Sequence, residues 1–371
     1  MDPIKTPARL ILVSSSPHIH CGSTVSAAMR DVLLALLPTI AAALWFFRFE
    51  ALTVILSCCL SAVFFEAACQ KMMRRSISVT DGSALLTGLL LALCLPPGLS
   101  PTLSIFGSFC AIVIGKQVFG GLGNNIFNPA HIGRAILLAS MPQQMTTWLQ
   151  PTPSFLDGLT KKAASATNAV TSATQTAYST HATTAATGNA VDAVSTATPL
   201  AMLRMSENIW QKGQSAADSL PNLLQMFVGN IPGSLGETCV PAILLGGLFL
   251  IWRGHVDWRI PFYYILTVFV ATGLYGYFRG YDALFPFYHL FGGGLMIGAF
   301  FMATDWVTSP LTKRGRIIYA VGLGLLTALI RLRGGYVEGV CYSILIMNML
   351  TPLIDRYIRT TPFGGRVHKN E

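Results

Sequence analysis

Long apolar runs separated by short polar connections dominate this chain and constrain its fold more than any motif does. Of its 371 residues, 52% are hydrophobic and only 11% are charged, whereas soluble domains carry about 25% charged residues. A membrane-spanning helix needs about 20 predominantly apolar residues, and stretches of this kind recur along most of the sequence. The composition therefore predicts an all-α integral membrane protein that crosses the membrane several times.

The apolar runs predict about ten transmembrane segments in two sets of five. The first set is expected at Ser26–Phe47, Ala51–Lys71, Ser83–Leu95, Thr102–Phe119 and Phe127–Ser140, and the second at Thr238–Trp252, Ile260–Phe278, Pro286–Ala303, Arg316–Arg331 and Tyr336–Ile354. The expected organisation is an N-terminal segment over 1–25, membrane repeats over 26–140 and 238–354, a polar loop over 141–237, and a tail over 355–371. The part of the loop over 154–198 is rich in Ala, Ser and Thr, a composition that cannot bury a core.

The placement of basic residues predicts the orientation of these segments. Most Lys and Arg residues fall on the side of the N-terminus, and the short loops of the other side hold only Arg48, Arg279, Arg331 and Arg333. Because short cytoplasmic loops carry the excess of positive charge, we expect both termini in the cytoplasm and the 141–237 loop in the periplasm. The net charge of +9 then reflects membrane topology and does not indicate nucleic-acid binding.

Matching Gly- and Pro-containing segments in the two halves indicate an internal repeat. Asp81-Gly82-Ser83 opens a glycine-rich helix that ends at Pro96-Pro97, and Gly293-Gly294 opens a similar helix that ends at Ser309-Pro310. An odd number of spans per repeat inverts the second copy, and inverted repeats with short, interrupted helices bind ligands near the membrane midplane. The alternative is that Gly and Pro are simply common in membrane helices.

Several ionisable residues lie within or at the edges of the predicted spans. They are Asp31, Glu66, Asp81, Lys116, Arg134, His289, Asp305, Glu338 and Asp355. A charge in hydrocarbon costs roughly 2.5–3.5 kcal/mol on insertion scales, so partners or functions are expected. We expect Lys116 to extend to the interface, whereas the shorter Glu66 is a candidate for a buried role. Arg331, Arg333 and Glu338 run against the positive-inside pattern, which predicts internal pairing or an anionic neighbour.

The cysteines and glycine runs exclude two classes of site. None of the eight cysteines forms a C-x-x-C pair, and most lie in apolar runs, so this chain alone is not expected to ligate zinc or an iron–sulfur cluster. A redox role would need an organic cofactor or an iron shared with another subunit. The runs Gly120-Gly121-Leu122-Gly123 and Gly292-Gly293-Gly294 do not complete a nucleotide-binding motif. We expect them to be close-packing glycines.

A short motif in the polar loop points to a covalent cofactor. Asp192, Ser195, Ala197 and Thr198 form the pattern D-x-x-[S/T]-x-A-[S/T], which resembles the site where a flavin transferase esterifies the phosphate of FMN onto a threonine. Other Ala-Thr pairs end at Thr167, Thr174, Thr183 and Thr187, but no acid stands six residues before them. The alternative is a chance match in a loop rich in Ser, Thr and Ala.

A second candidate site precedes the fifth predicted span. Asn124, Asn125 and Asn128 lie directly before Pro129, which suits the first turn of a helix. The free amide groups of such a helix start favour a polar or anionic ligand. The alternative interpretation is a cytoplasmic turn with Asn128 as an N-cap.

Three segments together carry a resemblance to a known family. Thr80-Asp81-Gly82-Ser83-Ala84-Leu85-Leu86-Thr87-Gly88, Phe127-Asn128-Pro129-Ala130 and Ser195-Thr196-Ala197-Thr198-Pro199-Leu200 resemble the D subunit of the bacterial Rnf complex. They are also similar to the B subunit of the sodium-pumping NADH:quinone oxidoreductase. The resemblance covers the chain from Ser26 to about Ile358, and the short segment before Ser26 favours the D subunit. One departure is Thr196, where glycine is common.

The resemblance implies a ten-helix inverted-repeat fold similar to that of urea transporters, in the bacterial inner membrane. It implies FMN joined by a phosphoester to Thr198, and a second, noncovalent riboflavin, which we expect near Asn124, Asn125 and Asn128. The phosphate of the FMN is hypothesised to lie near Arg331 or Arg333. Thr198 is then an attachment point, and Asp192 is expected to be read by the transferase.

The implied complex exchanges electrons between ferredoxin and NAD while it moves sodium ions or protons. This chain would be its redox subunit and not a catalyst on its own. Expected partners are the A, B, C, E and G subunits of the Rnf complex, the flavin transferase and the lipid membrane, with no nucleic acid. Two alternatives are a quinone-reducing B-type subunit and a flavin-free solute channel or transporter of the same architecture.

Overall fold

The computed structural model of this protein describes residues 24–76, 78–151, 198–205 and 221–358. Within these ranges the regular structure is entirely helical, with no β-strand, which confirms the all-α class predicted from the apolar runs. Three of the four flavin-motif residues, Asp192, Ser195 and Ala197, lie outside the described residues, as does most of the 141–237 loop. Thr198 lies within them.

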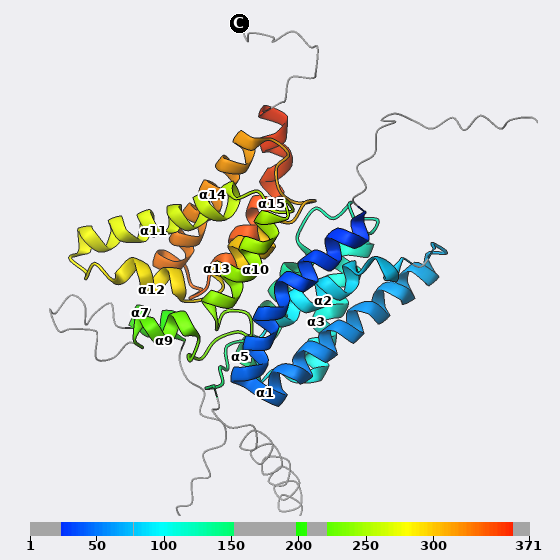
Figure 1. Cartoon of the computed structure of the whole chain (residues 1–371), viewed down its shortest axis with the longest axis horizontal. Helices are drawn as coiled ribbons and strands as arrows, with labels where there is room; N and C mark the ends of the chain where they lie inside the picture. Colours follow the sequence, from blue (N-terminus) through cyan, green and yellow to red (C-terminus); the bar gives the residue numbers. More distant parts are fainter. Residues whose placement is uncertain (1–23, 77, 152–197, 206–220, 359–371) are drawn as a thin grey trace, which may run out of the picture.

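The first two predicted spans are the two halves of one bent element, α1 (Val25–Met72). Thr24 caps its start, where the side chain accepts a hydrogen bond from the Ala27 backbone N–H at 3.2 Å. The helical geometry breaks at Arg48, with φ 50° and ψ −123°, and the chain folds back there so that the two halves run side by side (Figure 1). The corner falls between the two segments expected from the sequence.

In the rest of the first half, glycine and proline residues mark the positions where helices begin. Helix α2 (Ser83–Leu93) begins after Gly82, at φ 80°, and α3 (Pro101–Phe109) and α4 (Pro129–Ser140) each have a proline in the first turn. The π-helical segment η2 (Cys110–Gln117) continues α3, and the short α5 (Pro142–Met145) follows α4.

The turn between η2 and α4 corrects one expectation about the glycine runs. Gly120, Gly121 and Gly123 have φ values of 118°, 97° and 92°, a backbone region that residues with a side chain rarely adopt. These glycines serve a turn and are not helix-packing contacts. The Gly292–Gly294 run does pack closely, because a Cβ on any of its glycines would lie 3.0 Å or less from a neighbouring atom.

The second half contains a helix in each remaining predicted segment. The elements are α10 (Val240–Trp252), α11 (Arg259–Arg279), α12 (Phe285–Phe291), α13 (Leu295–Ile297) with the π-helical η4 (Gly298–Met302), α14 (Lys313–Arg333) and α15 (Val340–Tyr357). The eighth predicted segment is broken at the glycine run, where α12 and the α13–η4 unit meet at 63°. A broken helix exposes backbone N–H and C=O groups inside the molecule.

Three described helices are long and apolar enough to cross a membrane, namely α1, α11 and α14, and the bent pair of α12 and α13–η4 would add a fourth. Helices α2 and α10 are apolar but shorter. Large apolar side chains face outward, among them Leu60 at 69% exposed, Leu245 at 64% and Trp252 at 80%. Exposed apolar surface of this extent marks a membrane-contacting protein.

The two halves lie side by side and meet along helices from each. Figure 1 shows α1, α2 and α3 on one side and α11, α12 and α14 on the other, with α10 beside α1. Helix α4 contacts α15. The loop before α10 reaches into the first half, where the backbone N–H groups of Leu235 and Gly236 donate to the carbonyls of Leu95 and Leu93 at 3.2 and 2.7 Å. The backbone carbonyls at the C-terminal end of α2 therefore accept hydrogen bonds from the loop before α10.

Two short helices pack against the second half. They are α7 (Pro199–Met205) and α9 (Leu223–Val228), and both contact α12. Leu200 and Leu203 of α7 are buried in one cluster with Phe285 of α12. Apolar burial thus fixes α7 against the membrane domain, and with it the residue that precedes the helix, Thr198.

Candidate functional site

Thr198 occupies the cap position of α7. Its side-chain oxygen accepts a hydrogen bond from the Ala201 backbone N–H at 3.3 Å, and its carbonyl accepts from the Met202 backbone N–H at 2.9 Å. Pro199 in the first helical position lacks the N–H that would otherwise go unpaired. The residue is half-buried. The candidate attachment hydroxyl therefore sits at a defined point on the membrane domain, not at an arbitrary place in a loop.

A cavity of about 470 Å³ opens beside this hydroxyl, and we call it the Thr198 cavity. Its wall combines aromatic and aliphatic side chains, including Trp148, Tyr336, Leu138 and Ile231, with the charged residues Arg134, Glu237 and Glu338. Ligand sites in proteins are typically about 300–1,000 Å³, mostly apolar and furnished with a few placed polar groups. The Thr198 cavity has that size and character.

Charged side chains from both halves meet at one end of this cavity. The guanidinium of Arg134, on α4, donates to both carboxylate oxygens of Glu338, which lies between α14 and α15. The backbone N–H of Gly294, at the broken helix, also donates to Glu338 at 2.9 Å. Arg134 is 5% exposed and the Glu338 side chain is 20% exposed, so a buried guanidinium and a half-buried carboxylate tie the first half to the second. The prediction that Glu338 is paired internally is confirmed.

Arg331 lies near this ion pair, but its guanidinium binds the end of the broken helix α12. Its guanidinium donates to the carbonyl oxygens of His289 and, at 3.2 Å, Gly292, at the C-terminal end of α12. The side chain is buried, at 4% exposed, so the expected internal partner of Arg331 is a pair of helix-end carbonyls. It is absent from the wall of the Thr198 cavity, and so is the exposed Arg333. The hypothesis that either arginine lies by a phosphate at Thr198 gains no geometric support.

A second cavity, of about 370 Å³, lies next to the other predicted site, and we call it the Asn128 cavity. Asn125 and Asn128 line it, together with Ser83, Lys116 and Asp305. Asn124 does not line it and is exposed. The structure thus separates three residues that the sequence grouped together. Asn128 also caps α4 through the Ala130 N–H at 3.1 Å and donates to the Met302 carbonyl at 3.2 Å, so the N-cap interpretation holds as well.

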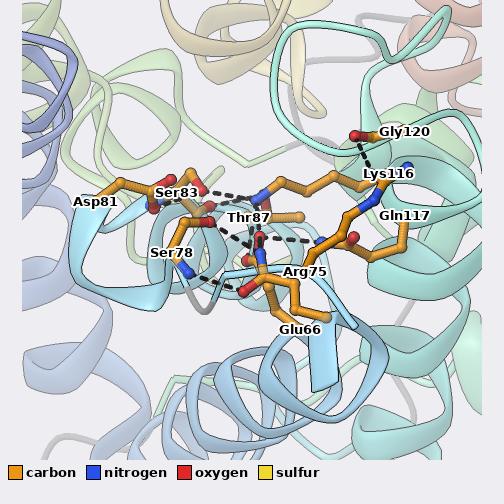
Figure 2. Close-up of polar contacts among 10 residues, drawn as sticks. Glu66, Arg75, Ser78, Asp81, Ser83, Thr87, Lys116, Gln117 and Gly120 are labelled. Carbon is orange, nitrogen blue, oxygen red and sulfur yellow. Dashed lines mark hydrogen bonds and ion pairs between the residues drawn. The ribbon is translucent and has the colours of Figure 1, made fainter. Parts of the chain in front are cut away.

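Lys116 does not reach the interface, contrary to the sequence-based expectation. Its ammonium lies 2.8 and 2.9 Å from the two carboxylate oxygens of Glu66 and 2.6 Å from the Ser83 hydroxyl. Figure 2 shows Lys116 extending from η2 toward Ser83 and Glu66. Lys116 is 2% exposed and Glu66 is 1% exposed. Lys116 pairs instead of snorkelling because an oppositely charged side chain lies within reach of its ammonium group.

Amide side chains complete the environment of this ion pair. Gln117 and Gln70 both donate to Glu66 Oε1, at 3.1 and 3.3 Å. The Gln70 side chain also accepts a hydrogen bond from the backbone N–H of Ser78 at 2.9 Å and donates one to its hydroxyl at 2.8 Å. The pair is therefore tied to α1, η2 and the loop before α2. No local pattern indicates which residues pair, because the partners lie 50 positions apart.

The start of α2 is held in the same network. Asp81 accepts from the backbone N–H and the hydroxyl of Ser83 at 2.8 and 2.7 Å, and Arg75 donates to the Gly120 carbonyl at 2.8 Å. The Asp81–Ser83 bonds lie within the segment that resembles the Rnf family, Thr80–Gly88, and Arg75 ties the chain just before that segment to the glycine turn. Ser83 can therefore present its hydroxyl to Lys116 at the wall of the Asn128 cavity.

No group of three or more His, Cys, Asp or Glu side chains in the described part of the chain could hold a metal ion. Seven cysteines fall in that part, all unbonded, and six of them are buried.

Comparisons with known proteins agree on one family. The model of the NQR2, RnfD, RnfE family matches residues 12–364. The D subunit of the proton-translocating ferredoxin:NAD(+) oxidoreductase complex of Clostridium ljungdahlii is 44% identical over 361 residues, covering 96% of this chain and 97% of that protein.

Two further relatives carry names of the same kind. The D subunit of the Na(+)-translocating ferredoxin:NAD(+) oxidoreductase complex of Acetobacterium woodii is 40% identical, covering 97% of this chain and 98% of that protein. The D subunit of the ion-translocating oxidoreductase complex of Stutzerimonas stutzeri is 40% identical over 350 residues, covering 92% of this chain and 93% of that protein.

Proposed function

The chain belongs to the NQR2, RnfD, RnfE family, and on that premise we propose that it is the D subunit of an ion-translocating ferredoxin:NAD oxidoreductase. It would sit in the bacterial inner membrane with the A, B, C, E and G subunits and carry electrons on FMN esterified to Thr198. The observation that carries the proposal is the position of Thr198, whose hydroxyl caps a docked helix at the wall of the Thr198 cavity.

The residues around the cavity fit a tethered flavin. Trp148 and Tyr336 offer aromatic faces of the kind on which a flat ring packs, while Leu138 and Ile231 keep the space apolar. FMN bound there would supply one- and two-electron transfer, and the protein would supply position and electrostatics. A covalent link keeps the cofactor at high local concentration on a side of the membrane where released FMN would be lost.

Membership of this family also underlies our proposals for the membrane topology and for a second cofactor. We propose ten spans in two inverted five-helix repeats, similar to urea transporters, with both termini cytoplasmic and the Thr198 loop periplasmic. We also propose that the Asn128 cavity holds a noncovalent riboflavin. The cavity supports this because it sets Asn125, Asn128, Lys116 and Ser83 in an otherwise largely apolar wall, which suits a heteroaromatic ring with polar edges.

A denaturing gel viewed under ultraviolet light tests the covalent flavin. The chain is co-expressed with the flavin transferase, and the wild-type band is expected to fluoresce after denaturation, whereas Thr198→Val gives a dark band. Thr187→Val, at an Ala-Thr pair without the upstream acid, is the matched control and should stay fluorescent. A dark wild-type band would favour the flavin-free transporter, and a fluorescent Thr198→Val band would place the flavin elsewhere.

The activity of the purified complex distinguishes a D subunit from a quinone-reducing B-type subunit. Ferredoxin-dependent reduction of NAD is expected if the chain is a D subunit. Quinone reduction by NADH would instead assign the chain to the sodium-pumping enzyme.

The noncovalent flavin is tested by what denaturation releases. Asn125→Leu would remove a polar group from the wall of the Asn128 cavity and should lower the released flavin several-fold while leaving the fluorescent band on the gel intact. Asn124→Leu, at the exposed neighbour outside that wall, is the control and should release as much as wild type. If both variants release as much flavin as each other, the Asn128 cavity is not the site of the noncovalent flavin.

A further inference from the structure

Arg134 and Glu338 of the Thr198 cavity pair with each other, whereas its third charged residue, Glu237, is in no ion pair found among the described residues. It lies in the loop that reaches from α10 into the first half, and it is 7% exposed. Only one weak donor reaches it, the backbone N–H of Ser234, at 3.4 Å from Oε2. Within the described ranges, no N–H or O–H group donates to Oε1. A buried carboxylate oxygen without a donor is costly, so the residue needs another explanation.

The carboxyl group of Glu237 faces that of Glu338. Both converge on Gly294, where a Cβ would lie 2.8 Å from Glu338 Oε1 and 3.2 Å from Glu237 Oε1. The two Oε1 atoms are therefore at most about 6 Å apart, since both lie so close to one point, and carboxyl groups at that distance influence each other's ionisation. Two ionised carboxylates at this separation repel and have no hydrogen to share, whereas one proton between them turns the contact into a hydrogen bond.

The surrounding cations do not neutralise Glu237. Arg134 is engaged by Glu338, and the guanidinium of Arg331 donates to the carbonyls of His289 and Gly292. No ion pair found in the described part of the chain includes Glu237. The other ionisable groups that interact electrostatically with the pair are Tyr264, His131, Cys94 and Cys341, and none of them supplies a cation in contact with it.

We propose that Glu237 and Glu338 form a proton-binding site, with one proton held on Glu237 and donated to Glu338 while Arg134 compensates the remaining negative charge. The ligand we assign is a proton, because one shared hydrogen is enough to remove the repulsion between the two carboxyl groups. Gly294 has no side chain, which leaves the space in which the two carboxyls meet. The site is defined by this chain's own residues and requires no flavin.

The two glutamates should respond differently to the same substitution. Glu237→Gln replaces a protonated acid by an amide that still donates to Glu338, so the unfolding midpoint of the full chain in detergent should stay near that of wild type. Glu338→Gln removes the partner of a buried guanidinium and should lower the midpoint strongly. A fall in Glu237→Gln equal to that in Glu338→Gln would overturn the proposal, because it would show that Glu237 acts as a charge.

Infrared spectroscopy detects the proton itself. At neutral pH in lipid nanodiscs, the wild-type full chain should show the carbonyl band of a protonated carboxylic acid, shifted in D₂O and missing in Glu237→Gln. Asp282→Asn, at an exposed acid outside the cavity, should leave the band in place. An unchanged band in Glu237→Gln, or a wild-type band abolished by sodium ions alone, would contradict proton binding at this pair.

Discussion

At the scale of single residues, the interior is organised by charges that find partners far away in the sequence. Lys116 and Glu66 are joined at 2.8 Å across 50 positions, and Arg134 and Glu338 across 204 positions. The Lys116–Glu66 pair is buried, Arg134 is buried against a half-buried Glu338, and each pair is supported by further donors or acceptors. Such pairs rarely add stability over an apolar pair of the same shape, but breaking one leaves an uncompensated charge. Their main effect is to fix which elements lie together.

The cost of breaking such a pair can be measured at Lys116 and Glu66. Lys116→Met and Glu66→Leu should each lower the free energy of unfolding by about 3–5 kcal/mol, whereas the double variant should be close to wild type. Unfolding of the full chain in detergent gives the three values. The half-exposed Arg253, paired with Asp31 at 2.9 Å, is the control, and Arg253→Met should cost less than about 1 kcal/mol. Additive losses in the double variant would show that the two charges do not interact.

At the scale of elements, the residues that begin and break helices can be recognised from local sequence. Pro129 with Asn128 predicts the start of α4, and Gly293-Gly294 predicts the break before α13, because both patterns act within a few residues of backbone. The partners of Lys116 and Arg134 could not be predicted, because they depend on how the two halves pack. The separation of Asn124 from its neighbours at the Asn128 cavity depends on the glycine turn, which periodicity does not reveal.

The corner of α1 supplies a prediction. Arg48 adopts φ 50° and ψ −123°, a conformation that costs a residue with a side chain roughly 1–3 kcal/mol. Its guanidinium stacks 4.7 Å from the Trp45 ring, which offsets about 0.5–1 kcal/mol. Arg48→Gly should therefore stabilise the chain by about 1 kcal/mol in thermal unfolding. Arg30→Gly, within the regular part of α1, should destabilise it by about 1 kcal/mol. Equal destabilisation by both substitutions would show that the corner is not strained.

At the scale of the whole molecule, broken elements from the two halves meet where the polar groups gather. The end of α2 receives the Leu235 and Gly236 N–H groups, and the break before α13 donates to Glu338. The Thr198 cavity lies against this junction, with α7 docked at its wall. The arrangement explains how one hydroxyl at the edge of a long polar loop comes to face the interior of a membrane domain.

The covalent flavin on Thr198 is the central claim, and intact-mass analysis of the mature chain tests it most directly. Protein made together with the flavin transferase should be heavier than the bare polypeptide by one FMN less one water, and Thr198→Val should have the bare mass. The bare mass in wild-type protein, from cells where the transferase flavinylates another substrate, would contradict the account.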